Sequence, residues 1–236
     1  MLSIVVDKKQ INEDFVIISN IKDIRHLINV YRLNVDDYFR VTDGEYQYIC
    51  KIFKVSKKEI LAKIENKDED IYSLNINIDV AIGLIKNDKM SLLIKKLTEI
   101  GVRNIIPLKT ERVVVKIDNS KSKWSDIVTE SMKQCRAVKR TNISEITNLR
   151  QIDFSSYDKV IYLYEKSLEN KKITEVISSE DKNILCIIGP EGGFTKNECN
   201  ILDEKNAIQI SLGNRILRAE TAAIVVCAIL SHSYGY

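Results

Sequence analysis

From residue 76 onward, short apolar runs alternate with segments of helical periodicity, and this alternation constrains the fold more than any other feature of the sequence. The apolar runs have the length of strands and cover residues 76–85, 104–108, 160–164, 184–188 and 208–212. The helical segments cover about residues 88–100, 122–138, 168–179, 196–205 and 217–231. Near-continuous apolar strands separated by helices are typical of a parallel sheet covered on both faces. The sequence therefore predicts an α/β fold in this part of the chain.

The first seventy residues have a different rhythm, in which apolar and polar residues alternate. The alternation covers three segments, residues 38–41, 46–55 and 59–64. Asp43-Gly44 lies between the first two and is a strong hairpin signal. These features predict a small β-barrel.

One helix is expected within this barrel region. Ser19 is placed to cap it, and its apolar positions recur at helical spacing at Ile21, Ile24, Leu27, Ile28 and Tyr31. The charged stretch at residues 65–70 is interpreted as a linker. We therefore expect two domains, residues 1–70 and residues 71–236.

Charge is unevenly distributed along a chain whose net charge is only +3. Residues 86–140 carry fourteen Lys or Arg against six Asp or Glu. Such a basic band is found on surfaces that bind nucleic acid, and also on solvated lysine-rich surfaces that bind nothing. Composition alone leaves both interpretations open.

The five cysteines and two histidines exclude several classes of site. The number of cysteines is odd, and no two have the CxxC spacing of a zinc or redox pair. His26 and His232 are the only histidines, so we expect no metal. The sequence has no signal-peptide pattern, and its longest apolar run, residues 222–230, is about half the length that spans a bilayer. A cytoplasmic protein with no membrane partner is expected.

Glycine is scarce in this chain, yet four of its eight glycines lie between Gly189 and Gly213. They belong to two loops that each follow a predicted strand, residues 189–194 and residues 212–213. Open α/β sheets bind ligands beyond the carboxyl ends of their strands, and glycine lets a ligand approach the main chain. The loops therefore predict a ligand held by main-chain groups. The alternative for each loop alone is an ordinary strand-to-helix turn.

Both loops lead into predicted helices. Thr195 and Glu198 have the spacing of a capping box at the first helix. The first loop matches neither GxGxxG nor GK[ST], which disfavours a dinucleotide site and a P-loop. Arg218 and Glu220 lie at the start of the second helix. The charge of Arg218 is unfavourable there unless an anion lies nearby, and pairing with Glu220 is the alternative to a ligand.

The two loops contain the motifs GPEGGF and LGNRILRAET, which resemble the signature of the RsmE family. That family comprises SPOUT-class methyltransferases that modify N3 of a uridine in small-subunit (16S) ribosomal RNA. Five further segments resemble family motifs in the same order along the chain: residues 26–33, 95–102, 107–112, 123–124 and 130–134. The resemblance covers nearly the whole chain, and ordered matches of this kind are far more specific than a single GPEGG.

The resemblance implies an N-terminal PUA-like β-barrel, a SPOUT domain with a deep trefoil knot, a homodimer, and S-adenosylmethionine as cofactor. In the family, the knot brings the two glycine loops together around the cofactor. The cofactor contacts implied for this chain are Tyr164, Glu165, Ile188, Gly189, Pro190, Gly193, Leu212, Gly213, Ile216, Leu217 and Thr221.

Methyl transfer to N3 of uridine requires loss of the N3 proton, and a cation near O2 or O4 stabilises the resulting anion. We expect Arg218 in this role, with Glu191 or Glu220 orienting it. No general base is assigned, because neither histidine lies in these motifs. N3 lies on the Watson–Crick edge, so the target base must be unpaired before it reacts. The expected RNA contacts are Arg25, His26, Arg32, Lys86, Lys96, Arg112 and Arg136.

Three departures from the family pattern fall in the parts of the chain that are expected to contact RNA. Arg25 replaces the first histidine of the family's pair, the family's Arg-Phe-Phe start is absent, and Arg136 stands one place early. For His26 a purely structural role is an equal alternative.

Two other functions fit parts of the sequence. One is a catalytically silent RNA-binding or ribosome-assembly protein, and the other is a related SPOUT enzyme that acts on transfer RNA. The intact segment Arg218-Ala219-Glu220-Thr221 favours an enzyme. The barrel and the turn Thr110-Glu111-Arg112 favour the 16S ribosomal RNA within the small subunit as substrate.

Overall fold

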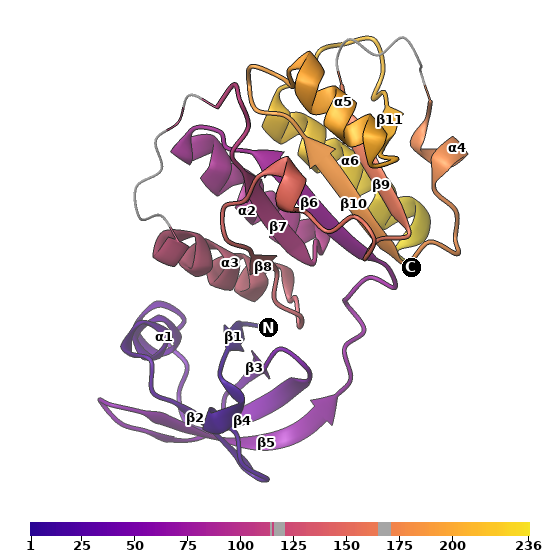
Figure 1. Ribbon diagram of the computed structural model, residues 1–236. Helices are drawn as coiled ribbons and strands as arrows, with labels where there is room; N and C mark the ends of the chain where they lie inside the picture. The colour runs from indigo at the N-terminus through magenta and orange to yellow at the C-terminus, as the bar shows by residue number, and fades with distance from the viewer. Residues whose placement is uncertain (114, 116–120, 165–170) are drawn as a thin grey trace. The chain divides into compact units, whose positions relative to one another are not determined.

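The computed structural model describes residues 1–113, 115, 121–164 and 171–236. The chain forms two compact units (Figure 1). The first comprises Met1–Ser73 and Met132–Arg140, and the second comprises Leu74–Ser131 and Thr141–Tyr236. Each unit has its own sheet and its own core.

The first unit is built on a curled five-stranded sheet in the order β1-β3-β4-β5-β2. All neighbouring strands are antiparallel except β1 and β3, which are parallel. The strands are β1 (Ser3–Val5), β2 (Phe15–Ile18), β3 (Tyr38–Thr42), β4 (Gln47–Val55) and β5 (Ile60–Asp68). Short helical segments complete the unit, namely η1 (Lys8–Gln10), α1 (Ile21–Arg25) and the π-helix η2 (His26–Val30).

One local prediction for this unit is confirmed and two are corrected. Asp43-Gly44 does connect β3 to β4, and the core is formed by side chains such as Leu27, Phe39 and Ile52. The helix cap is Asn20 rather than Ser19, because the Asn20 side chain accepts hydrogen bonds from the first main-chain N–H groups of α1. The expected linker at residues 65–70 is mostly strand, since β5 continues to Asp68.

The second unit contains the predicted parallel sheet, in the order β11-β9-β10-β6-β7-β8. Every pair of neighbouring strands in it is parallel. The strands are β6 (Asn77–Gly83), β7 (Asn104–Leu108), β8 (Asn142–Ile143), β9 (Lys159–Leu163), β10 (Asn183–Ile188) and β11 (Ile208–Ile210). The two-residue strand β8 is an addition to the predicted set.

Helices cover both faces of this sheet (Figure 1). The helical elements that follow β6 are α2 (Asn87–Ile100), α3 (Lys121–Cys135), α4 (Ile173–Val176), α5 (Lys196–Glu204) and α6 (Ala219–Tyr234), with η3 (Leu149–Gln151) as a single 3-10 turn. The last residues of α3, from Met132 onward, belong to the first unit. On one face, Phe194 and Leu202 pack on side chains of β10 such as Leu185. On the other face α6 packs against α2 and the sheet, and Cys227 of α6 contacts Cys186 of β10. Burial raises the pKa of the Cys227 thiol, which keeps it protonated.

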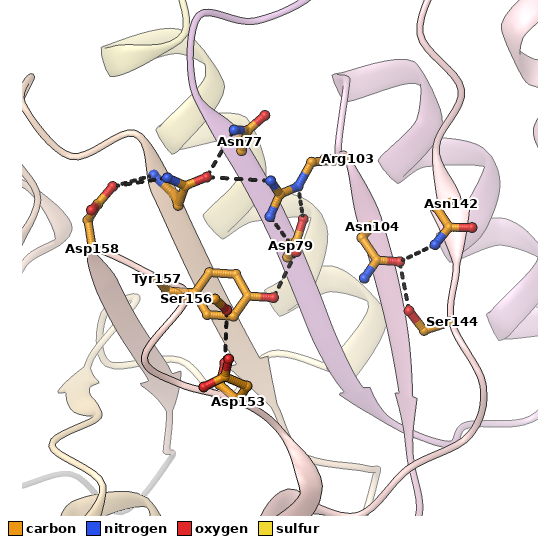
Figure 2. A network of polar contacts seen from close by, with 11 residues as sticks. Asn77, Asp79, Arg103, Asn104, Asn142, Ser144, Asp153, Ser156, Tyr157 and Asp158 are labelled. Carbon is orange, nitrogen blue, oxygen red and sulfur yellow. Dashed lines mark hydrogen bonds and ion pairs between the residues drawn. The ribbon is translucent and has the colours of Figure 1, made fainter.

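The amino-terminal edge of the sheet is held by a polar network (Figure 2). Asp79 of β6 is only 3% exposed and accepts hydrogen bonds from Nε and Nη2 of Arg103, each at 2.8 Å. The Tyr157 hydroxyl donates to the same carboxylate at 2.8 Å. Arg103 also reaches Asn183 at the start of β10, at 3.4 Å. The network therefore ties the start of β10, whose opposite end carries the first glycine loop, to β6 and to the segments that precede β7 and β9.

Candidate active site

A cavity of about 650 Å³ lies at the carboxyl ends of β9, β10 and β11. Its volume falls in the range of about 300–1,000 Å³ that is usual for small-molecule sites. Both glycine loops line it, together with residues at the end of β9 and the start of α6. The cavity therefore lies where parallel α/β sheets bind their ligands.

The first loop is a tight turn that brings main chain to the cavity wall. Gly193 has a φ of 65° and donates its N–H to the carbonyl of Pro190 at 2.8 Å. The loop also touches the end of β6, where a Cβ on Gly83 would lie 2.5 Å from the Pro190 nitrogen. A side chain at residue 83 would therefore displace the turn. The loop is both a strand-to-helix turn and part of the cavity, so the two interpretations of its glycines are compatible.

The predicted helix start after this loop is confirmed. Thr195 caps α5, and Thr195 and Glu198 form the reciprocal hydrogen bonds of a capping box. On the other side of the loop, the main-chain N–H of Lys86 approaches the Glu191 carboxylate at 3.5 Å. Lys86 is the N-cap residue of α2, so Glu191 lies close to the start of that helix.

The second loop supplies part of the apolar wall. Its residues Leu212, Ile216 and Leu217 line the cavity together with Ile188 at the end of β10. Ile216 is 82% exposed although it is a large hydrophobic residue. An apolar side chain at the rim of a cavity gains free energy when a ligand or a partner covers it.

Among the described residues, Arg218 is one of two arginines that line this cavity, the other being Arg215. It lines the cavity, its side chain is exposed, and it occupies the N-cap position of α6 without a side-chain capping bond. Within the described part of the chain it forms no ion pair with Glu220. Glu220 is only 6% exposed and lies outside the cavity lining, whereas Glu191 is part of that lining. The alternative explanation of Arg218 as the partner of Glu220 therefore has no contact to support it.

The cavity brings together nine of the residues expected to contact a cofactor. These are Tyr164, Ile188, Gly189, Pro190, Gly193, Leu212, Gly213, Ile216 and Leu217. Thr221 is exposed on α6 outside the lining, and Glu165 lies outside the described residues. Sequence reasoning missed lining residues within the motifs and beside them, namely Leu163, Gly192, Phe194, Ile210, Ser211, Asn214, Arg215, Ala219 and Ala222. Gly192 and Phe194 could have been predicted, because they belong to the GPEGGF motif itself.

The residues expected to contact RNA are divided between the two units. Arg25, His26, Arg32 and Arg136 belong to the first unit, and Lys86, Lys96 and Arg112 to the second. Most have exposed side chains, and His26 is half-buried with its ring 4.9 Å from that of Tyr31. Lys96 pairs with Glu99 at 2.7 Å. Arg112 contacts main-chain carbonyls of the first loop.

The described residues contain neither a membrane-spanning helix nor a metal-binding cluster. None of the helices there is long and apolar enough to cross a membrane. No group of three or more His, Cys, Asp or Glu is arranged to hold a metal ion among those residues.

Comparison with known proteins agrees with the architecture. A family model described as an RNA methyltransferase domain matches residues 72–231, and one described as an RNA methyltransferase PUA domain matches residues 18–65. The chain is 29% identical to ribosomal RNA small subunit methyltransferase E of Bacillus subtilis, over 95% of this chain and 93% of that protein. It is 31% identical to the enzyme of the same name from Rickettsia conorii, over 87% of this chain and 84% of that protein.

Among solved structures, a putative methyltransferase from Legionella pneumophila in complex with the cofactor SAM superposes with a TM-score of 0.87. It is 25% identical in sequence, and the match covers 100% of this chain and 98% of that one. The fold, the cavity motifs and these relatives agree, and the chain belongs to the RsmE family of ribosomal RNA small subunit methyltransferases.

Proposed function

We propose that this protein binds S-adenosylmethionine in the cavity between the two glycine loops and methylates N3 of a uridine in 16S ribosomal RNA. The observation that carries the proposal is the cavity itself, because residues from both family motifs line it and Arg218 stands at its edge. The names of the sequence relatives and the cofactor bound by the Legionella protein support it.

The residues present fit this cofactor. Main-chain N–H and carbonyl groups of the first loop suit an adenine edge, and the aliphatic side chains of Ile188, Leu212 and Leu217 suit its faces. Tyr164, Glu165 and Thr221 are proposed to complete the contacts. S-adenosylmethionine supplies an activated methyl group. The protein's contribution is to hold the donor and the uracil ring at near-attack distance, which is a large term for a transfer of this kind.

Arg218 is proposed to stabilise the uracil anion. An N3–H group is a poor nucleophile until its proton is lost, and a guanidinium near O2 or O4 offsets the charge that then develops. Arg218 has no competing ion pair among the described residues, so it is free to turn toward a base. Glu191 shares the cavity with it and is the proposed orienter, whereas Glu220 is buried at the start of α6 outside the lining.

The wider context is also proposed. Residues 1–70 would bind RNA and residues 71–236 would carry catalysis, in agreement with the two family models. The expected RNA contacts other than Arg112, which contacts the protein's own main chain, would bind phosphates of the 16S RNA within the small subunit, in the cytoplasm. The family resemblance adds a homodimer, and the trefoil knot stays a prediction of that resemblance.

Isothermal calorimetry tests the cofactor assignment. The purified chain should bind S-adenosylmethionine and its demethylated product with micromolar dissociation constants. A silent RNA-binding protein would be folded and bind RNA, yet release no heat with either compound. That result would remove the proposed function.

A further inference from the structure

We propose that Arg112 is a positioning residue for the cofactor loop, and that with Glu198 it holds residues 191–194 in place from outside the cavity. This inference rests on the proposed function, because it concerns how that cofactor site keeps its shape. Arg112 was expected to contact RNA on the strength of its motif. Its contacts in the structure are with the protein's own main chain.

Arg112 holds two carbonyl groups of the first loop. Its Nη1 donates to the carbonyl of Gly192 at 2.9 Å and to that of Phe194 at 3.3 Å. These carbonyls flank Gly193, the residue of the loop with a φ of 65°. The stem of Arg112 packs directly on the loop, since a Cβ on Gly192 would lie 3.1 Å from the Arg112 Cβ. Gly192 is therefore the residue that allows the arginine to approach.

Glu198 fixes the same turn to the start of α5. It is 4% exposed, and its Oε1 accepts a hydrogen bond from the main-chain N–H of Glu111 at 2.9 Å. Its Oε2 accepts from the N–H of Thr195 at 2.8 Å and from the hydroxyl of Thr195 at 3.1 Å. Glu198 therefore does more than cap α5, because it also binds the main chain of Glu111. Through one buried carboxylate it joins the start of α5 to Glu111, 87 positions earlier in the sequence.

The loop needs this support because its own bonds are few. Glycine residues permit many main-chain conformations, so a loop with three of them is costly to order. Within the loop, one main-chain hydrogen bond closes the turn, from Gly193 to Pro190. Arg112 and Glu198 lie outside the cavity lining, while Gly192, Gly193 and Phe194 are part of it. The two side chains therefore act on a bound cofactor through the backbone, by ordering it before binding.

The test compares cofactor and RNA binding in the full-length chain. Arg112→Ala should raise the calorimetric dissociation constant for S-adenosylmethionine about tenfold, as expected for losing charge-assisted hydrogen bonds. Its affinity for a small-subunit RNA fragment, and the salt dependence of that affinity, should stay as in the wild type. Arg112→Lys should fall between the two, because a lysine donates without the arginine fork. Glu198→Gln should also weaken cofactor binding. The NH2 group of the glutamine would face one of the three groups that now donate to the carboxylate, namely the N–H of Glu111 and the N–H and hydroxyl of Thr195.

Lys109→Ala is the matched control, because it removes an exposed positive charge from the same turn without a side-chain contact to the loop. It should leave cofactor affinity unchanged. The inference is overturned if Arg112→Ala binds S-adenosylmethionine within twofold of the wild type. It is also overturned if the variant loses only RNA affinity, with a salt slope smaller by about one. Failure of the wild-type chain to bind the cofactor would instead remove the proposed function. Should Arg112→Ala not fold, Arg112→Lys and Glu198→Gln provide the same comparison.

Discussion

At the scale of single residues, the proposed chemistry depends on Arg218, and the geometry depends on a few close approaches of the main chain. Arg218 occupies the N-cap position of α6, lines the cavity and has no ion-pair partner in the part of the chain that the structure describes. Gly83 and Pro190 are in contact so tight that no side chain fits between them. Both features lie at strand ends, where the fold delivers residues from distant parts of the sequence to one place.

Arg218→Ala is expected to lower kcat by about 100-fold or more, because one preorganised stabiliser of a developing anion contributes that much. The dissociation constant for S-adenosylmethionine should change little, since the cofactor is held by the loops. Single-turnover methyl transfer to small-subunit RNA and calorimetry on the same preparation measure the two effects. Near-normal turnover in Arg218→Ala would exclude this residue from the mechanism.

Gly83→Ala is expected to destabilise the second unit by about 1–3 kcal/mol, because the added methyl overpacks the contact with Pro190. Cofactor affinity should fall with it, since the displaced residue belongs to the cavity lining. Urea unfolding and calorimetry test both effects. Gly44→Ala is the control, because Gly44 lies in the hairpin of the first unit, where a Cβ meets nothing within 4 Å. The backbone strain of an alanine at the positive φ of Gly44 should leave cofactor affinity unchanged.

At the scale of elements, the second unit is organised by what happens at the two edges of its parallel sheet. The carboxyl edge carries the cavity, and the amino edge carries the network of Asp79, Arg103 and Tyr157. Burial, and then the hydrogen bond to Asp79, raise the pKa of the Tyr157 hydroxyl above its ordinary value. The network orders the starts of β6 and β10 and so fixes the position of their opposite ends.

The raised pKa of Tyr157 gives stability a defined pH dependence. The hydroxyl binds its proton more tightly in the folded state, so this stabilisation is complete below the ordinary tyrosine pKa of about 10 and is lost as pH rises beyond it. Tyr157→Phe should cost about 1 kcal/mol near neutral pH and should flatten the loss of stability above pH 10. Urea unfolding between neutral pH and about pH 11 measures this. The exposed Tyr236→Phe is the control, and an identical pH profile for wild type and Tyr157→Phe would contradict the assignment.

The sequence predicted the elements whose formation depends on local signals. The bounds of β7 and the start of α5 agree with prediction, because an apolar run and a capping box are encoded within a few residues. The continuation of β5 to Asp68 was missed, because its last residues are charged and exposed and pair with β4 through main-chain hydrogen bonds. Lys67 in this segment lies 3.6 Å from the centroid of the Tyr46 ring, a contact that no periodicity reveals.

The same distinction holds at the candidate site. Loop residues of the cavity could be predicted because glycine motifs follow strands, and most of the expected contacts do line the cavity. The task of Arg112 could not, since its acceptors Gly192 and Phe194 lie 80 and 82 residues further along the chain. Periodicity and motif matching carry no information about such tertiary contacts. The sequence likewise could not show that Arg218 and Glu220 form no ion pair in the described structure, because the two residues are close enough in sequence to pair.

At the scale of the whole molecule, the two units have different tasks under the proposed function. The cavity and its supporting contacts lie within the second unit. The first unit, which contains the residues matched by the PUA model, has no part in the cavity lining. Cofactor binding should therefore stabilise mainly the second unit.

Hydrogen exchange with and without S-adenosylmethionine tests this division of tasks. At a cofactor concentration 100 times the dissociation constant, the linked stabilisation is about 2.7 kcal/mol. Protection should appear in the loops at residues 189–194 and 211–217 and in the elements packed on them. Strands β3 to β5 of the first unit should exchange as before. Equal protection throughout both units would contradict the assignment of the cofactor to the second unit alone.

The most direct test of the central claim is mass spectrometry of nucleosides from small-subunit ribosomal RNA. A strain that lacks this chain should lose one N3-methyluridine from that RNA. The wild-type chain should restore it, and Arg218→Ala, expressed at the same level, should not. If N3-methyluridine persists in full without the chain, or returns with the Arg218 variant as it does with the wild type, the proposed reaction or its proposed catalytic residue is contradicted.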